Sequence, residues 1–142
     1  MKISSRFSVA VHILSLLSIF EDIVWTSDAI AGSVNTNPVV IRRVVGMLKK
    51  AGIVRVNAGC GGAYLLKPTE NITLFDVYKA VEVVEDGHLF KIHEEPNSNC
   101  FVGANIENVL ECTLLAAQSA MEKELKKITI TDIANGILKK IE

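Results

Sequence analysis

The sequence is poor in the residues that mark disordered, fibrous and disulfide-stapled proteins. Of its 142 residues, 9 are glycine, 3 are proline and 3 are cysteine. So little glycine and proline, with no low-complexity stretch and no internal repeat, excludes disordered, collagen-like and solenoid proteins. Three cysteines are an odd and sparse set, which favours reduced thiols over a disulfide framework. Hydrophobic residues make up 49% of the chain, enough for one globular domain with a core.

Long apolar runs are also missing. The longest, residues 9–20, contains a histidine and two serines and falls short of the roughly 20 residues that a membrane span needs. Lys2 and Arg6 precede this run as in a signal peptide, but no small-x-small cleavage site follows it. We therefore expect a cytoplasmic protein with no membrane segment.

The net charge of -1 conceals a division of the chain into two parts of opposite sign. Residues 1–68 contain 8 basic and 3 acidic side chains, a balance of +5, whereas residues 69–142 contain 7 basic and 13 acidic ones, a balance of -6. A basic half is expected to meet a polyanion such as nucleic acid, although small domains often differ by a few charges. The local sequence pattern must therefore decide between nucleic-acid binding and an ordinary difference in charge.

Helical periodicity over residues 7–20 predicts a core helix, and polar start signals predict two more helices behind it. Thr26 is a suitable N-cap for a short helix that begins at Ser27. After a turn, Asn37 as N-cap and Pro38 in the first helical position predict a helix that runs to about Lys50. This arrangement is typical of a helix-turn-helix, whose second helix enters the major groove by its N-terminal end.

The second helix of this motif has one apolar and one polar side. Arg42 and Arg43 lie on the polar side, and their guanidinium groups match both guanine edges and phosphates. Adjacent arginines alone would fit the solvated face of any helix, so the case depends on the hairpin described next. The predicted DNA-binding residues are Thr26, Ser27, Asn37, Pro38, Val39, Arg42, Arg43, Lys49, Arg55 and Asn57.

A β-hairpin is predicted after the second helix. Residues 53–56 and 63–66 are strand-like, and the glycine-rich residues 57–62 form the turn between them. A glycine-rich loop can also cradle phosphate, but this one lacks the Gly-Lys-Ser/Thr ending and precedes a strand, so we exclude nucleotide binding. The fold class is therefore mainly α: a winged helix-turn-helix domain with a small β-hairpin wing, plus a long helix in the second half.

The second half is predicted to contain a helix over residues 74–84, a loop over 85–99 and a long helix. A final short helix is expected to start at Thr131 and to pack back on the DNA-binding part. The long helix spans about 35 Å, more than a small domain can cover, so we expect it to pack on its copy in a homodimer. The predicted interface residues are Ile106, Leu110, Leu114, Ala117, Met121 and Leu125. Residues 1–68 then form the DNA-binding domain, and residues 69–142 form the dimerisation and possible sensing region.

Three blocks of sequence, residues 51–54, 59–66 and 72–82, resemble the Rrf2 family of bacterial winged-helix regulators in the same order. The resemblance spans essentially the whole chain. It implies a homodimeric transcription factor, usually a repressor, that binds a pseudo-palindromic operator in double-stranded DNA. Many members carry arginine at the wing tip where this chain has Ala58, so any wing contact would depend on Arg55 or Asn57.

Cluster-binding members of that family have three cysteines with five residues between consecutive ones. The corresponding residues here are Cys100, Ile106 and Cys112, and isoleucine supplies no thiolate, so we expect no iron–sulfur cluster and no other cofactor. Zinc binding by the two cysteines with His88 and His93 is arithmetically possible, but the spacing is irregular and we predict no metal site.

Cluster-free members include thiol-based sensors, which makes Cys100, Cys112 and Cys60 redox candidates here. Cys100 follows a polar loop and is expected to react first, with a disulfide to Cys112 or to the other subunit as one product. The opposing possibility, that no cysteine senses anything, stays open, because sequence does not show a thiol pKa.

We find no set of catalytic residues in the sequence. The paired acidic residues lie in a polar loop, and no serine or cysteine nucleophile has a histidine base in a recognisable motif. The sequence therefore predicts a DNA-binding transcriptional regulator. The alternative is a winged-helix adaptor that acts by binding an enzyme or another regulator, and salt-dependent binding to duplex DNA distinguishes the two.

Overall fold

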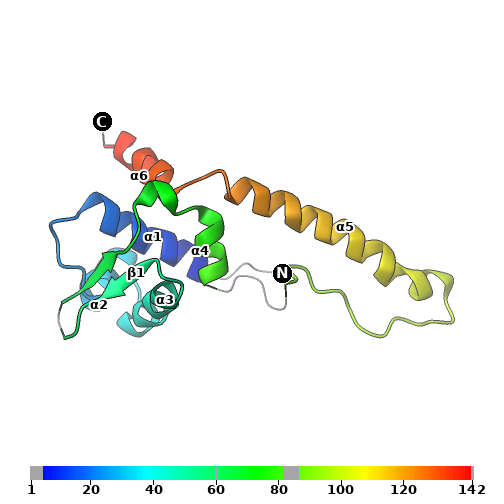
Figure 1. Ribbon diagram of the computed structural model, residues 1–142. Helices are drawn as coiled ribbons and strands as arrows, with labels where there is room; N and C mark the ends of the chain where they lie inside the picture. The colour runs from blue at the N-terminus through cyan, green and yellow to red at the C-terminus, as the bar shows by residue number, and fades with distance from the viewer. Residues whose placement is uncertain (1–4, 60, 82–86, 142) are drawn as a thin grey trace.

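A computed structural model describes residues 5–59, 61–81 and 87–141 (Figure 1). Its elements, in chain order, are α1 (Arg6–Ile19), α2 (Ser27–Val34), α3 (Pro38–Lys50), β1 (Val54–Val56), β2 (Ala63–Leu65), the 3-10 helix η1 (Thr69–Asn71), α4 (Leu74–Ala80), α5 (Phe101–Leu125) and α6 (Ile130–Lys139). The predicted mainly helical fold with a small hairpin is confirmed. No helix in the described ranges is long and apolar enough to cross a membrane.

The two helices of the helix-turn-helix begin at the predicted caps. The Thr26 hydroxyl accepts a hydrogen bond from the Ala29 amide at 3.2 Å, and the Asn37 side-chain oxygen accepts one from the Val39 amide at 2.8 Å. Pro38 occupies the start of α3, where its missing amide hydrogen costs nothing. Local sequence alone therefore positions the N-terminus of α3.

The hairpin is antiparallel, and its register pairs Val54 with Leu65, Arg55 with Tyr64, and Val56 with Ala63. Trp25 extends this sheet by a single bridge to Ala63. A side chain at position 62 would meet the carbonyl oxygen of Trp25 at 3.1 Å, and the φ angle of +78° there also favours glycine. Gly62 thus allows the loop before α2 to lie against the wing.

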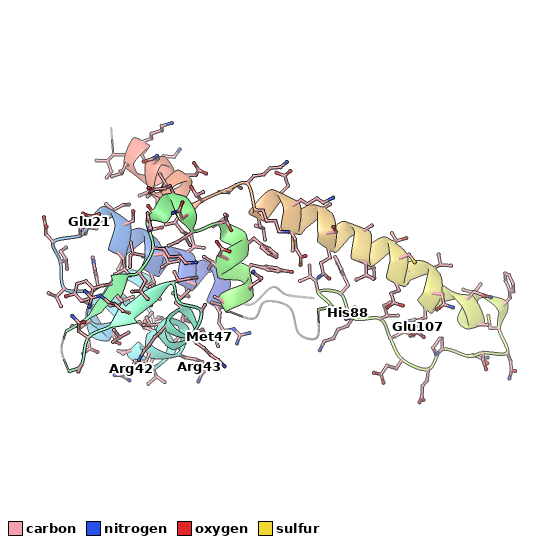
Figure 2. All side chains as sticks on the ribbon, in the orientation of Figure 1. Glu21, Arg42, Arg43, Met47, His88 and Glu107 are labelled. Carbon is pink, nitrogen blue, oxygen red and sulfur yellow. The ribbon has the colours of Figure 1, made fainter. Side chains whose placement is uncertain are left out.

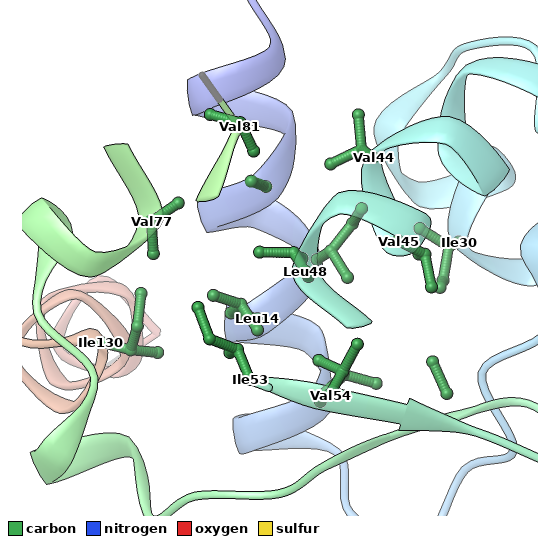
Figure 3. Close-up of a cluster of buried hydrophobic side chains, with 14 of the residues drawn as sticks. Leu14, Ile30, Val44, Val45, Leu48, Ile53, Val54, Val77, Val81 and Ile130 are labelled. Carbon is green, nitrogen blue, oxygen red and sulfur yellow. The ribbon is translucent and has the colours of Figure 1, made fainter. Parts of the chain in front are cut away.

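One hydrophobic core joins the helix-turn-helix to the elements that follow the wing (Figure 3). Leu14 of α1 and Leu48 of α3 are fully buried in it, and so are Val77 of α4 and Ile130 of α6. The Ile130 amide also donates to the Ile72 carbonyl at 2.9 Å. The prediction that the final helix packs on the DNA-binding part is therefore confirmed, and the division of function at residue 68 stays a prediction.

Two predicted helix boundaries differ from the structure. The helix expected over residues 74–84 ends at Ala80 with Val81 as its C-cap, and residues 82–84 lie outside the described ranges. The final helix begins earlier than expected because Thr129 caps it, in a box that Asp132 completes.

Helix α5 projects from the rest of the molecule as a rod (Figure 1), and a chain of hydrogen bonds attaches it to α4. The Tyr78 hydroxyl donates to the Glu122 carboxylate at 2.9 Å, and the Gln118 amide donates to the same carboxylate at 3.1 Å. Gln118 also donates to the Gly87 carbonyl and accepts from the Leu89 amide. This network links α4, α5 and the loop that precedes α5.

We expect Tyr78→Phe to lower the free energy of unfolding by about 1 kcal/mol, because it removes one donor from a half-buried carboxylate. Burial, and then the hydrogen bond to Glu122, raise the pKa of Tyr78 above its ordinary value of 10.0. As the pH rises past 10.0, tyrosine ionises in the unfolded chain but stays protonated at position 78, so stability falls with pH.

Urea denaturation between pH 8 and pH 11 measures both effects. The matched control is Tyr64→Phe, since the hydroxyl of Tyr64 makes no hydrogen bond within the described part of the chain. Equal stability of the wild type and Tyr78→Phe at all pH values would contradict the role given to Tyr78.

Candidate nucleic-acid interface

The outer face of α3 is strongly basic. Arg42, Arg43, Lys49 and Lys50 are exposed there, and α3 contains no acidic residue. The opposite face is buried through Ile41, Val44, Val45 and Leu48, which fixes the direction in which the arginines point. Figure 2 shows Arg42 and Arg43 on the outer side of α3, away from the core. Val39, 53% exposed at the start of the helix, adds an apolar contact point of the kind that thymine methyl groups fit.

An open groove of about 260 Å³ lies between the start of α2, the helix α3 and the hairpin. Thr26, Ser27 and Arg42 line it together with Val56 and Gly59 of the hairpin. The first amides of a helix lack intrahelical partners and carry partial positive charge, which suits a phosphate. The fold thus brings three of the predicted DNA-binding residues to one groove beside α3.

Three of the other predicted residues lie at the start of α3. Asn37 uses its side-chain oxygen as the cap, which leaves its amide nitrogen for an outside acceptor. Pro38 is half-buried, and Val39 is exposed. Of the three, Asn37 and Val39 can reach a ligand.

Arg55, the arginine of the wing, lies away from the groove beside α3. Arg55 donates to the side-chain oxygen of Asn57, and its guanidinium carbon lies 4.6 Å from the centre of the Tyr64 ring. Arg55 lines a second groove of about 240 Å³ with Glu21 and Trp25, and does not line the groove beside α3. The structure therefore separates Arg55 from Arg42, although both are predicted to bind DNA.

Cys100 is exposed and serves as the N-cap of α5. The backbone amides of Gly103 and Val102 lower the pKa of its thiol below the ordinary value. Glycine is required at 103, since a side chain there would collide with the backbone of Asn97. A thiol at a helix N-terminus with a lowered pKa is the reactive kind.

Cys112 lies on α5 and is exposed as well, so it is not a buried core residue. It follows Cys100 by twelve residues of a continuous helix, which places the two about 18 Å apart along the axis. A disulfide requires Cα atoms within about 7 Å, so the predicted disulfide between these two residues of one chain is wrong for this conformation. Cys60, the third redox candidate, lies outside the described residues.

The predicted dimer stripe is partly covered by the chain's own loop. Ile106, Leu110, Leu114, Met121 and Leu125 are half-buried, and Ala117 is exposed. Leu114 and Gln118 line a small crevice with Phe90 and Ile92 of that loop. Gln118 is not among the predicted residues. Its signal in the sequence is a polar amide four residues after Leu114, where the helical period of the stripe calls for an apolar side chain.

A different face of α5 is fully open. Phe101, Val102 and Val109 are large apolar side chains exposed there, at 85%, 63% and 66%. Val102 and Val109 are seven residues apart and therefore share one side of the helix. Single exposed apolar residues are ordinary, but a row of them on a projecting helix is typical of an interaction face.

A basic helix-turn-helix with a hairpin wing and a projecting helix defines a winged-helix DNA-binding regulator. A family model described as Rrf2, iron-dependent transcriptional regulator, matches residues 3–136. The chain belongs to the Rrf2 family and is a DNA-binding transcriptional regulator, not an enzyme.

Three known proteins illustrate the similarity of this chain to others in sequence and in fold. The HTH-type transcriptional regulator YwnA of Bacillus subtilis (strain 168) is 48% identical over 135 residues, which cover 95% of this chain and 98% of YwnA. A crystal structure of a transcriptional regulator from Lactobacillus plantarum has a TM-score of 0.80 at 25% identity, covering 94% of this chain and 89% of that one. CymR, the global cysteine regulator of B. subtilis, has a TM-score of 0.68 at 19% identity over 95% of this chain and 97% of its own, a likeness of fold.

The iron in the family's description does not fit the residues present. Over the described ranges, no three side chains of histidine, cysteine, aspartate or glutamate are grouped as metal ligands. Cys100 and Cys112 are too far apart on α5 to share a cluster, and Ile106 between them has no donor atom.

Proposed function

We propose that the chain is a homodimeric repressor that binds a pseudo-palindromic operator by inserting α3 into the major groove. The observation that carries this is the outer face of α3, with four cations and no acid, beside a groove that Thr26 and Ser27 line. Guanidinium groups bind guanine edges and phosphates, and an open helix N-terminus binds phosphate. Because its target is chromosomal DNA, we place the protein in the cytoplasm.

The open apolar face of α5 supports the dimer. A copy of α5 packed on Val102 and Val109 would remove two large exposed side chains from water. Two-fold symmetry of the protein then requires two half-sites about one DNA turn apart, at 10 to 10.5 base pairs.

Selection from a random duplex library tests the operator. The wild-type protein is expected to enrich an inverted repeat with that half-site spacing, and footprinting should show protection of two successive major grooves on one face of the DNA. Enrichment of no sequence would contradict the proposed function, and a single unrepeated site would contradict the dimeric mode.

We also propose that oxidation of Cys100 regulates DNA binding. Its thiolate sulfur attacks the terminal oxygen of a hydroperoxide, so that an S–O bond forms as the O–O bond breaks. The sulfur is oxidised to sulfenic acid, and the alkoxide or hydroxide that leaves takes a proton from water to give an alcohol or water. Cys100 is the N-cap residue of α5, so a change of its charge and size acts at the outer end of the proposed dimer helix (Figure 1). The separation of the two copies of α3 depends on that helix.

We expect hydrogen peroxide to lower the affinity of the wild type for the selected duplex, and Cys100→Ser to be unaffected, because serine has no oxidisable sulfur. Cys112→Ser is the matched control, since it removes the other described thiol of α5 and should respond as the wild type does. Fluorescence anisotropy follows binding, and non-reducing gels detect a disulfide between subunits. A Cys100→Ser protein that still loses affinity would exclude Cys100 as the sensor.

A further inference from the structure

Gly46 lies in the interior of α3, on the same outer face as Arg42 and Arg43. It is exposed, and its backbone is ordinary helix rather than the left-handed conformation that favours glycine. A Cβ atom built at this position would meet nothing within 4 Å. Neither packing nor backbone conformation within the chain therefore requires glycine here.

Glycine in a helix interior is unfavourable, because it loses more backbone entropy on folding than alanine does. Gly46 therefore destabilises α3, the helix that is proposed to enter the major groove. Nothing in the described part of the chain compensates for this cost, whereas a partner that approaches α3 closely at position 46 would do so.

The surroundings of Gly46 indicate what approaches. Arg42 and Arg43 precede it by one turn, and Lys49 and Lys50 follow it by one turn, so Gly46 is a gap in an otherwise cationic surface. The major groove is about 12 Å wide, and an α-helix with its side chains measures about 10 to 12 Å across. A helix that fills the groove this tightly leaves little room for a side chain where it faces the groove wall.

We propose that Gly46 is the point at which the backbone of α3 lies against the DNA, and that the absence of a side chain there lets Arg42 and Arg43 reach the base edges. Gly46 is thus a positioning residue: it contributes no hydrogen-bonding group of its own and sets the depth of the helix in the groove. This inference rests on the proposed function, because it requires α3 to be the helix that enters DNA.

Gly136 provides a matched control. It also lies in a helix interior, in α6, where it is exposed, has an ordinary φ angle and would place a Cβ atom in open space. No residue of α6 lines the groove beside α3. Substitutions at 46 and 136 therefore change helix propensity equally and differ in what the new side chain meets.

The experiment compares alanine and leucine at both positions, with the duplex that the wild type enriches from the random library as the probe. Gly46→Ala and Gly136→Ala should each raise the Tm by about 3 °C. Gly46→Ala should weaken binding about fivefold and Gly46→Leu about fiftyfold, as expected for side chains forced into a packed interface. Both Gly136 variants should bind as the wild type does.

Three results would overturn the inference. One is wild-type affinity for Gly46→Leu, which would mean that α3 does not approach DNA at this point. Another is equal weakening by leucine at 46 and 136, which would point to a general loss of structure. The third is a lower Tm for Gly46→Ala with a higher Tm for Gly136→Ala, which would show that the chain itself needs glycine at 46. If the wild type enriches no duplex, the proposed function fails and this inference fails with it.

Discussion

Val109→Glu is expected to convert the proposed dimer to monomers and to weaken binding to the selected duplex at least tenfold. Val109 is 66% exposed in the single chain, so glutamate is solvated there in the monomer. In a dimer packed on this face the same carboxylate would be buried without a partner, at a cost of about 3 to 5 kcal/mol. Sedimentation measures the dissociation, and circular dichroism shows whether the monomer stays folded.

Two further variants separate the interface from folding. Leu114→Glu places a charge in the crevice formed with Phe90 and Ile92, so it should destabilise the chain itself. Glu107→Lys changes an exposed charge on the opposite side of the same helix, two residues from Val109, and should leave the dimer intact. A Val109→Glu protein that sediments as the wild-type dimer would show that the subunits associate through another surface.

The Arg42→Ala and Arg43→Ala variants should each lose about 1 to 3 kcal/mol of binding if the arginine makes a bidentate contact with a base. Loss of a base contact relaxes the preference at one position of each half-site, whereas loss of a phosphate contact weakens all sequences alike. Repeating the library selection with each variant therefore identifies which arginine reads sequence.

The charge-matched control for both arginines is Lys139→Ala, because Lys139 is an exposed cation at the end of α6. It should bind DNA nearly as the wild type does. Unchanged affinity and unchanged sequence preference in the folded Arg42→Ala, Arg43→Ala double variant would remove α3 from the interface.

The elements specified by local sequence could be predicted closely. Helix α3 runs from Pro38 to Lys50 as expected, because Asn37 caps its start and the left-handed Gly52 follows its end. The direction of Arg42 and Arg43 also follows from the sequence, since the helical period places them opposite the buried apolar side chains of α3.

The parts that depend on contacts between distant segments could not be predicted. Periodicity identifies an apolar stripe on α5, but it does not show that residues 87–92 cover the middle of that stripe and that Val109 on another face stays open. The hairpin was predictable, whereas the separation of Arg55 from the groove beside α3 depends on its stacking on Tyr64. Cys100 was placed at the end of the loop, but its lowered pKa depends on the fold of the amides of Gly103 and Val102 around it.

The most direct test of the DNA-binding function is the affinity of the wild-type protein for the selected duplex and for an unrelated duplex across a series of salt concentrations. Phosphate contacts from the cations of α3 predict that log K falls linearly with log salt for both duplexes. We also expect the selected duplex to bind more tightly at every salt concentration. Affinity that does not change with salt, or that is the same for both duplexes, would contradict the assignment of α3 as a reader of DNA sequence.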